Sequence, residues 1–122
     1  MRLFTIAIYA YRDALAILKE IGNPLGQAAA LNNIGLVYAK QGKLEEALKS
    51  YQDALTIHKE ISKPLGQANT LLNIGRVYFN QDKKTEAMEL FGEARAIFLE
   101  IGATRKWQLV ERRISQLETA MK

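Results

Sequence analysis

The sequence predicts an all-α protein built from a repeated pair of helices. Residues 11–50 and 51–90 are identical at 23 of 40 aligned positions, and a third, fading copy begins at Phe91. Apolar residues recur at helical intervals of three, four and seven, and no segment alternates as a half-buried strand would. A repeat of this length is typical of stacked helix pairs. We expect about six helices, over residues 3–21, 25–41, 44–61, 65–81, 84–101 and 104–121.

The first expected helix, 3–21, begins with an apolar run that imitates a signal peptide. Arg12 and Asp13 interrupt this run, and Tyr11 aligns with Tyr51 of the next copy. We therefore interpret 3–21 as a structural helix. No segment of the chain approaches the roughly 20 apolar residues that a membrane span requires, so we expect no membrane partner.

Helices 25–41 and 44–61 form the first complete pair. Asn23 suits an N-cap and Pro24 the first helical position, because proline lacks the N–H that would stay unpaired there. Gly42 is expected to end the first helix of the pair. The apolar faces consist of Leu31, Ile34 and Tyr38 in the first helix, and Leu44, Ala47, Leu48, Tyr51, Ala54 and Leu55 in the second.

Helices 65–81 and 84–101 repeat this pair, including a glycine within the first helix. Gly35 and Gly75 occupy positions where glycine costs about 1 kcal/mol relative to alanine. We expect each to lie where a neighbouring helix comes so close that no side chain fits. Ala54 and Ala94 on the second helices indicate the same close packing.

The last helix, 104–121, aligns with the first helix of a pair but carries Ser115 and Glu118 in place of glycine and tyrosine. A polar outer face is typical of the cap that ends a stack of repeats. Glu111, Arg112 and Glu118 are expected to face water. The residues expected to pack inward are Trp107, Val110, Ile114, Leu117 and Met121.

The composition argues against catalysis and metal binding. The chain has no cysteine and a single histidine, His58, so catalytic triads and common zinc sites lack members. His58 aligns with Leu18 and Phe98 on an inward stripe, which favours a partly buried structural role. We expect no enzyme, cofactor or metal. The absence of cysteine favours a reducing compartment, hence the cytoplasm.

The net charge of +4 favours acidic partners only mildly. The basic residues are dispersed apart from one group in the last helix, which we interpret as a solvated helix face rather than a nucleic-acid site. This group consists of Arg105, Lys106, Arg112 and Arg113.

Both copies resemble the tetratricopeptide repeat. The pattern appears at Leu31, Ile34–Gly35, Tyr38, Ala47, Tyr51 and Ala54, and again at Leu71, Ile74–Gly75, Tyr78, Ala87, Phe91 and Ala94. The family's commonest period is 34 residues, whereas the period of 40 resembles the variety found in kinesin light chains and Inscuteable-binding adaptors. The resemblance implies a right-handed α-solenoid of antiparallel helix pairs, whose first helices line a concave groove. It also implies a non-enzymatic protein–protein interaction scaffold that binds an extended peptide segment in that groove.

We interpret residues 1–122 as one domain of such repeats. Residues 1–23 supply the second helix of an incomplete repeat, 24–63 and 64–103 are full repeats, and 104–122 form a C-terminal capping helix.

A polar stripe runs beside the buried face of each first helix. An asparagine amide offers one acceptor and two donors, so Asn33 and Asn73 suit the backbone of an extended peptide. Arg76 and Arg113 would favour an acidic side chain or a free C-terminal carboxylate, because arginine binds carboxylates bidentately. The alternative is that both asparagines are solvated residues copied when the repeat duplicated. The predicted peptide-binding residues are Asn33, Leu36, Lys40, Asn69, Asn73, Arg76, Asn80 and Arg113.

Leu72 and Phe79 are expected on the exposed side of their helix, where they would give the groove an apolar pocket. Packing against helix 84–101 is the alternative for both.

The first helix also predicts a second kind of interaction. Ile6 and Tyr9 stand where the next copy has Glu46 and Lys49, so an exposed face has become apolar. Self-association as a homo-oligomer and a longer array of repeats are two explanations of this face. A third reading makes the chain a regulatory fragment of a larger protein.

Overall fold

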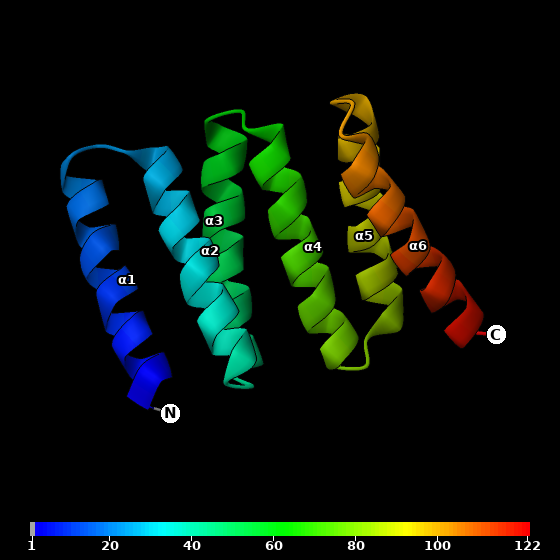
Figure 1. Cartoon of the computed structure of the whole chain (residues 1–122), viewed down its shortest axis with the longest axis horizontal. Helices are drawn as coiled ribbons and strands as arrows, with labels where there is room; N and C mark the ends of the chain where they lie inside the picture. Colours follow the sequence, from blue (N-terminus) through cyan, green and yellow to red (C-terminus); the bar gives the residue numbers. More distant parts are fainter. Residues whose placement is uncertain (1) are drawn as a thin grey trace. The chain divides into compact units, whose positions relative to one another are not determined.

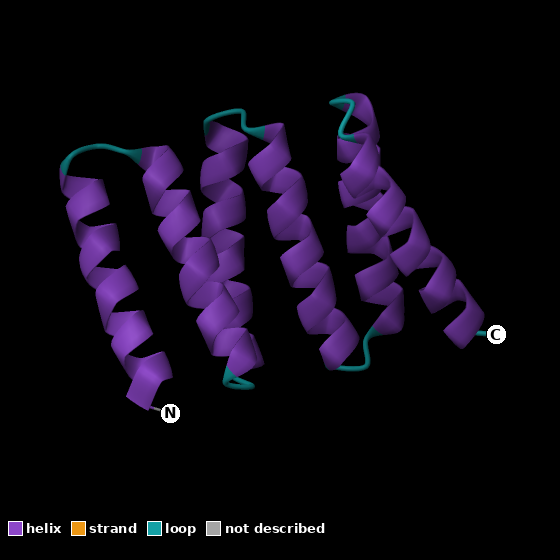
Figure 2. Ribbon diagram, viewed as in Figure 1, coloured by secondary structure: helices purple, strands orange, loops and turns teal. Residues whose placement is uncertain are grey.

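The structure is a computed structural model that describes residues 2–122. It contains six α-helices and, within the described residues, no strand (Figures 1 and 2). Every predicted helix is confirmed, and each observed end lies within one residue of its predicted position. The helices are α1 (Arg2–Glu20), α2 (Pro24–Lys40), α3 (Leu44–Glu60), α4 (Pro64–Asn80), α5 (Lys84–Glu100) and α6 (Thr104–Ala120).

The helices belong to two compact units, Met1–Lys63 and Pro64–Lys122, called here the N-terminal and C-terminal units. In the N-terminal unit α2 packs against both α1 and α3. In the C-terminal unit α5 packs against both α4 and α6. Each unit therefore contains one complete helix pair and one additional helix.

All five turns between helices have one conformation. The residue in the middle of each turn has a positive φ, and the N–H of the next residue bonds to a carbonyl five residues earlier, as Asn23 N does to Leu18 O at 2.9 Å. This is the Schellman arrangement, which satisfies the last carbonyls of a helix. Glycine, which adopts this conformation without strain, occupies three of the five positions. The five residues are Gly22, Gly42, Ser62, Asp82 and Gly102.

The beginning of α2 also agrees with the sequence. Asn23 Oδ1 accepts a hydrogen bond from the backbone N–H of Gly26 at 2.9 Å, and Pro24 is the first helical residue. This confirms the predicted cap.

Gly35 within α2 and Gly75 within α4 mark close helix contacts. A Cβ atom on Gly35 would lie 2.6 Å from Cε1 of Tyr51, and one on Gly75 would lie 2.6 Å from Cε1 of Phe91. Tyr51 and Phe91 are almost completely buried. The predicted close contacts are therefore confirmed, with an aromatic ring of the second helix lying on the glycine of the first.

His58 is buried in α3. Among the described residues its Nδ1 has no hydrogen-bond partner, and burial lowers its pKa because the charged form loses hydration. This agrees with a structural role.

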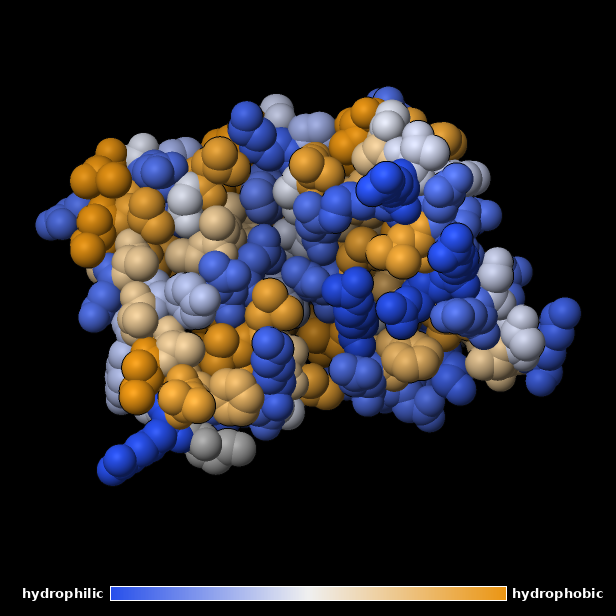
Figure 3. Space-filling view, in the orientation of Figure 1, coloured by the Kyte–Doolittle hydropathy of each residue, from blue (hydrophilic) through white to orange (hydrophobic). Residues whose placement is uncertain are grey.

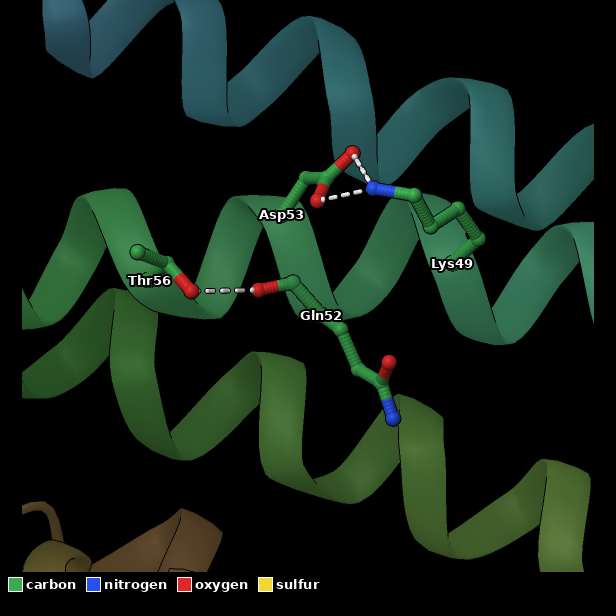
Figure 4. A network of polar contacts seen from close by, with 4 residues as sticks. All are labelled: Lys49, Gln52, Asp53 and Thr56. Carbon is green, nitrogen blue, oxygen red and sulfur yellow. Dashed lines mark hydrogen bonds and ion pairs between the residues drawn. The ribbon is translucent and has the colours of Figure 1, made fainter.

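The outer face of α3 is polar, since Lys49, Gln52 and Thr56 are exposed and Asp53 is half-buried; Figure 4 shows the contacts among these four residues. Lys49 Nζ lies 2.7 and 2.9 Å from the two carboxylate oxygens of Asp53, one turn further along the helix. The hydroxyl of Thr56 donates a hydrogen bond to the backbone carbonyl of Gln52 at 3.0 Å. Such contacts are typical of a solvated helix surface.

Helix α1 has a different outer face, because Tyr9 replaces the lysine of that ion pair. Ile6 and Tyr9 are 61% and 62% exposed, and apolar atoms gather at the edge that α1 occupies in Figure 3. Four α1 residues are half-buried, although the aligned residues of α3 are buried. These four are Ala7, Tyr11, Ala14 and Leu18, which align with Ala47, Tyr51, Ala54 and His58.

Helix α6 packs inward largely as predicted. Val110, Ile114 and Leu117 are buried. Met121 is 47% exposed, so its predicted inward packing is wrong; it lies beyond the last residue of α6. Glu111 was expected to face water but is half-buried and forms an ion pair with Arg95 of α5.

Candidate functional site

Five of the predicted peptide-binding residues belong to the C-terminal unit. Helix α4 carries four of them, and these lie one turn apart because their spacing is four, three and four residues. Asn69 and Asn73 are half-buried, whereas Arg76 and Asn80 are exposed. Arg113 is exposed on α6. In Figure 3 hydrophilic side chains gather over α4 and α6 around smaller apolar areas.

A cavity of about 220 Å³ brings three of these residues together. Its lining contains two charged side chains, both arginines, which come from different helices. Phe79 and Phe91 supply apolar walls. The complete lining is Arg76, Phe79, Asn80, Phe91 and Arg113. The arrangement suits an anion attached to an apolar stem, because arginine donates two parallel hydrogen bonds to a carboxylate.

Phe91 connects this cavity to the repeat architecture. The ring whose edge lies on Gly75 also forms part of the cavity wall. The glycine–aromatic contact that joins α4 to α5 thus also positions one wall of the candidate site.

Asn73 is not on the cavity wall, but it contacts a residue that is. Arg76 Nη1 donates a hydrogen bond to Asn73 Oδ1 at 3.3 Å. Because the oxygen accepts this bond, the Nδ2 group is the part of the amide suited to donate to a peptide carbonyl.

Asn69 makes a contact that the sequence did not suggest. Lys106 Nζ of α6 donates a hydrogen bond to Asn69 Oδ1 at 3.1 Å and lies 5.8 Å from the ring centroid of Phe98. Lys106 therefore belongs to the candidate site. In the sequence, Lys106 is distinguished by replacing the glycine that both other copies have at this position, Gly26 and Gly66.

The expectation for Leu72 and Phe79 is half correct. Phe79 is 44% exposed and lines the cavity, as predicted. Leu72 is buried, so its predicted exposure is wrong. It lines a small space with Phe91 of α5 and with Leu109 and Val110 of α6. The sequence of α4 alone could not show that α6 covers this residue.

The remaining predicted residues belong to the N-terminal unit. On α2, Asn33 is half-buried, while Leu36 and Lys40 are exposed. The spacing of three and four residues places them on one side of the helix.

The family model of the tetratricopeptide repeat matches residues 26–100. This chain belongs to the tetratricopeptide repeat family. The match covers both helix pairs except the first two residues of α2, with Gly35, Tyr51, Gly75 and Phe91 at their repeated positions. No curated protein sequence matches the chain.

Solved structures share the fold at low sequence identity. BtubC (BKLC) from P. vanneervenii is 19% identical over 97% of this chain and 57% of its own length, with a TM-score of 0.68. A putative kinesin light chain from Podosopora anserina is 14% identical over 93% of this chain and 57% of its own, with a TM-score of 0.76. The N-terminal domain of stress-induced protein-1 (STI-1) from C. elegans is 16% identical over 94% of this chain and 97% of its own, with a TM-score of 0.68.

The chain thus spans 57% of the length of the first two structures. Its tetratricopeptide repeat fold is that of a protein–protein interaction scaffold. None of the helices in residues 2–122 is long and apolar enough to cross a membrane.

Proposed function

We propose that this tetratricopeptide repeat protein binds an extended peptide along the polar stripe of its first helices. Asn33 in the N-terminal unit and Asn73 in the C-terminal unit are each suited to hold peptide backbone, and Arg76 and Arg113 of the C-terminal unit take an acidic side chain or a free C-terminal carboxylate. The observation that carries the proposal is the cavity between two arginines and two phenylalanines in the C-terminal unit. Its charge and its walls together suit a carboxylate on an apolar stem.

The role of the asparagines is supported by chemistry and by repetition. Asn33 and Asn73 occupy the same place in two copies, while the positions around them change: Leu36 aligns with Arg76. A planar amide can pair with both N–H and C=O of a peptide, which gives affinity with little dependence on sequence. The arginines then supply the preference for an anion.

A peptide-library selection on the full chain tests this proposal. Asn33→Ala with Asn73→Ala is the counter-screen, and we expect it to lose the selected peptides while helicity and melting temperature stay unchanged. Enrichment of acidic or C-terminally free peptides is the expected preference. Peptides that bind both proteins equally would refute the role of the asparagines.

The arginines are tested with a selected peptide. We expect Arg113→Gln to weaken binding at least about tenfold, since a charge-assisted hydrogen bond contributes about 1.5–3 kcal/mol. Arg112→Gln is the matched control, because Arg112 is also exposed on α6 but does not line the cavity. Equal losses in the two variants would indicate general attraction by charge and would contradict a specific site.

The apolar outer face of α1 favours a second candidate function, self-association. Ile6 and Tyr9 expose apolar surface where α3 carries Glu46 and the ion-paired Lys49, and a second copy of the chain would cover it. Variants of Ile6 and Tyr9 that copy the aligned residues of α3 test this candidate.

A further inference from the structure

We propose that the N-terminal unit contains a separate anion site, between α1 and α2, that binds a phosphate monoester carried on a side chain of a partner protein. The site is a cavity of about 270 Å³. It shares no residue with the polar stripe, so it does not depend on the peptide groove. Its lining consists of Thr5, Ile8, Tyr9 and Arg12 from α1, Tyr38 from α2, and Gln41 and Lys43 from the turn that follows α2.

The charge of the lining selects an anion. Arg12 and Lys43 are its charged residues, and both are positive. The guanidinium of Arg12 donates a hydrogen bond to the hydroxyl of Tyr38, which holds the arginine at the cavity wall. Arginine has five N–H donors, so one bond to tyrosine leaves most of its donor capacity for a ligand.

A phosphate monoester suits these groups better than a carboxylate does. It carries a charge of about −1.5 to −2 at neutral pH and has three strong acceptor oxygens. Two cations can therefore both be neutralised by one group. The hydroxyls of Tyr9 and Tyr38 and the amide of Gln41 add polar groups around the cations.

The size of the cavity indicates what carries the phosphate. A volume of 270 Å³ lies just below the roughly 300–1,000 Å³ of small-molecule sites. It admits one phosphorylated side chain rather than a dinucleotide. The exposed ring of Tyr9 offers an apolar wall for the stem of that side chain.

The next copy of the repeat lacks these features. Three lining residues of α1 have a net charge of +1, whereas the aligned residues of α3 have a net charge of zero, because a glutamate and a lysine are lost and an arginine is gained. Thr5, Tyr9 and Arg12 align with Glu45, Lys49 and Gln52.

The tyrosine and the lysine recur in the C-terminal unit, but their arrangement differs. Lys83 Nζ lies 5.8 Å from the centroid of the Tyr78 ring. In the N-terminal unit the Tyr38 hydroxyl is instead held by Arg12, and Lys43 lines the cavity. The anion site therefore arises from the residues particular to α1.

The test is a titration of the isotope-labelled full chain, followed by amide chemical shifts. The probes are phenyl phosphate, inorganic phosphate and benzoate. We expect phenyl phosphate to cause saturable shifts at residues 5–12 and 38–43, with inorganic phosphate weaker and benzoate weakest. Binding should also weaken between pH 7 and pH 5, because the second pKa of the phosphate is about 6.

Single variants then assign the site. We expect Arg12→Gln and Lys43→Gln each to weaken phenyl phosphate at least about fivefold, since each removes one charge-assisted contact. Lys43 is exposed in a turn, so its replacement leaves the fold intact even if the Arg12 variant does not. Lys83→Gln is the matched control and should change the affinity less than about twofold.

Three results would overturn the proposal: absence of saturable shifts at the cavity, benzoate binding as tightly as phenyl phosphate, or an equal loss in the Lys83 variant. The variant Asn33→Ala with Asn73→Ala should leave phosphate binding unchanged. Failure of the peptide groove and failure of the phosphate site can thus be distinguished.

Discussion

Gly35 and Tyr51 fit together so closely that a Cβ atom on residue 35 would lie 2.6 Å from the tyrosine ring. The same relationship joins Gly75 to Phe91 in the C-terminal unit. In each complete helix pair, therefore, an aromatic ring of the second helix packs directly on the backbone of the first helix at its glycine.

This contact predicts that Gly35→Ala is destabilising although alanine is the better helix former. Because Tyr51 is almost completely buried and cannot move aside freely, we expect a loss of about 1–3 kcal/mol in the free energy of unfolding. The measurement is urea denaturation followed by circular dichroism. Gly92→Ala is the matched control: a Cβ at residue 92 of α5 would meet no atom within 4 Å, so this variant should gain about 0.5–1 kcal/mol. A Gly35→Ala protein as stable as the parent would contradict the packing described.

At the positive-φ positions, a change to glycine and a change from glycine should have opposite effects on the melting temperature. Ser62, between α3 and α4, has a φ of 54°, and Gly22, at the aligned position between α1 and α2, has a φ of 69°. Ser62→Gly should therefore raise the melting temperature, with a gain of about 1 kcal/mol, because the left-handed conformation costs a side chain about 1–2 kcal/mol. Gly22→Ala should lower it by a similar amount. If both changes shifted the melting temperature in the same direction, backbone strain would not be the cause.

The buried His58 predicts a loss of stability at acidic pH. Its pKa is lowered in the folded protein from an ordinary value near 6.5, so the unfolded chain binds a proton more readily than the folded one. Stability from this residue is therefore present above about pH 6.5 and decreases as the pH falls toward the folded pKa. We expect His58→Phe, which copies Phe98 at the aligned position, to flatten the pH dependence of the unfolding free energy between pH 7 and pH 5. An unchanged slope would assign the acid sensitivity to other groups.

The outer face of α1 predicts that self-association can be removed by copying α3. Ile6→Glu with Tyr9→Lys introduces the residues found at the aligned positions of α3 and places a lysine one turn before Asp13, as Lys49 stands before Asp53. Sedimentation equilibrium should show a concentration-dependent oligomer for the parent chain and a monomer for the variant. Helicity should not fall, because such a pair contributes about 0.3–0.5 kcal/mol to a helix. The same mass for both proteins over the whole concentration range would remove the basis for an interface on α1.

Much of this architecture could be predicted from the sequence because it depends on short-range signals. Asn23, Pro24 and Gly42 mark helix ends through their own backbone preferences. Gly35 and Gly75 indicated close contacts because their intrinsic cost within a helix requires a compensating reason.

The candidate site was only partly predictable because its remaining features depend on which helices meet. The periodicity of α4 placed Arg76 and Asn80 together, and the alignment placed Arg113 near them. That Lys106 bonds to Asn69, or that Leu109 and Val110 cover Leu72, follows from the packing of α6, which the sequence of α4 does not contain. The cavity beside Arg12 was likewise missed, since its wall combines α1 with the far end of α2.

The uniform turns explain the forty-residue period and suggest how the protein can change in length. Helices α2 to α6 each contain 17 residues and are joined by turns of three residues with one conformation, so two helices and two turns account for the whole period. A duplication or deletion of 40 residues would therefore create no new kind of joint. Evolution can lengthen or shorten such a protein by whole modules and adjust the reach of its binding surface in fixed increments, while the side chains of each module diverge.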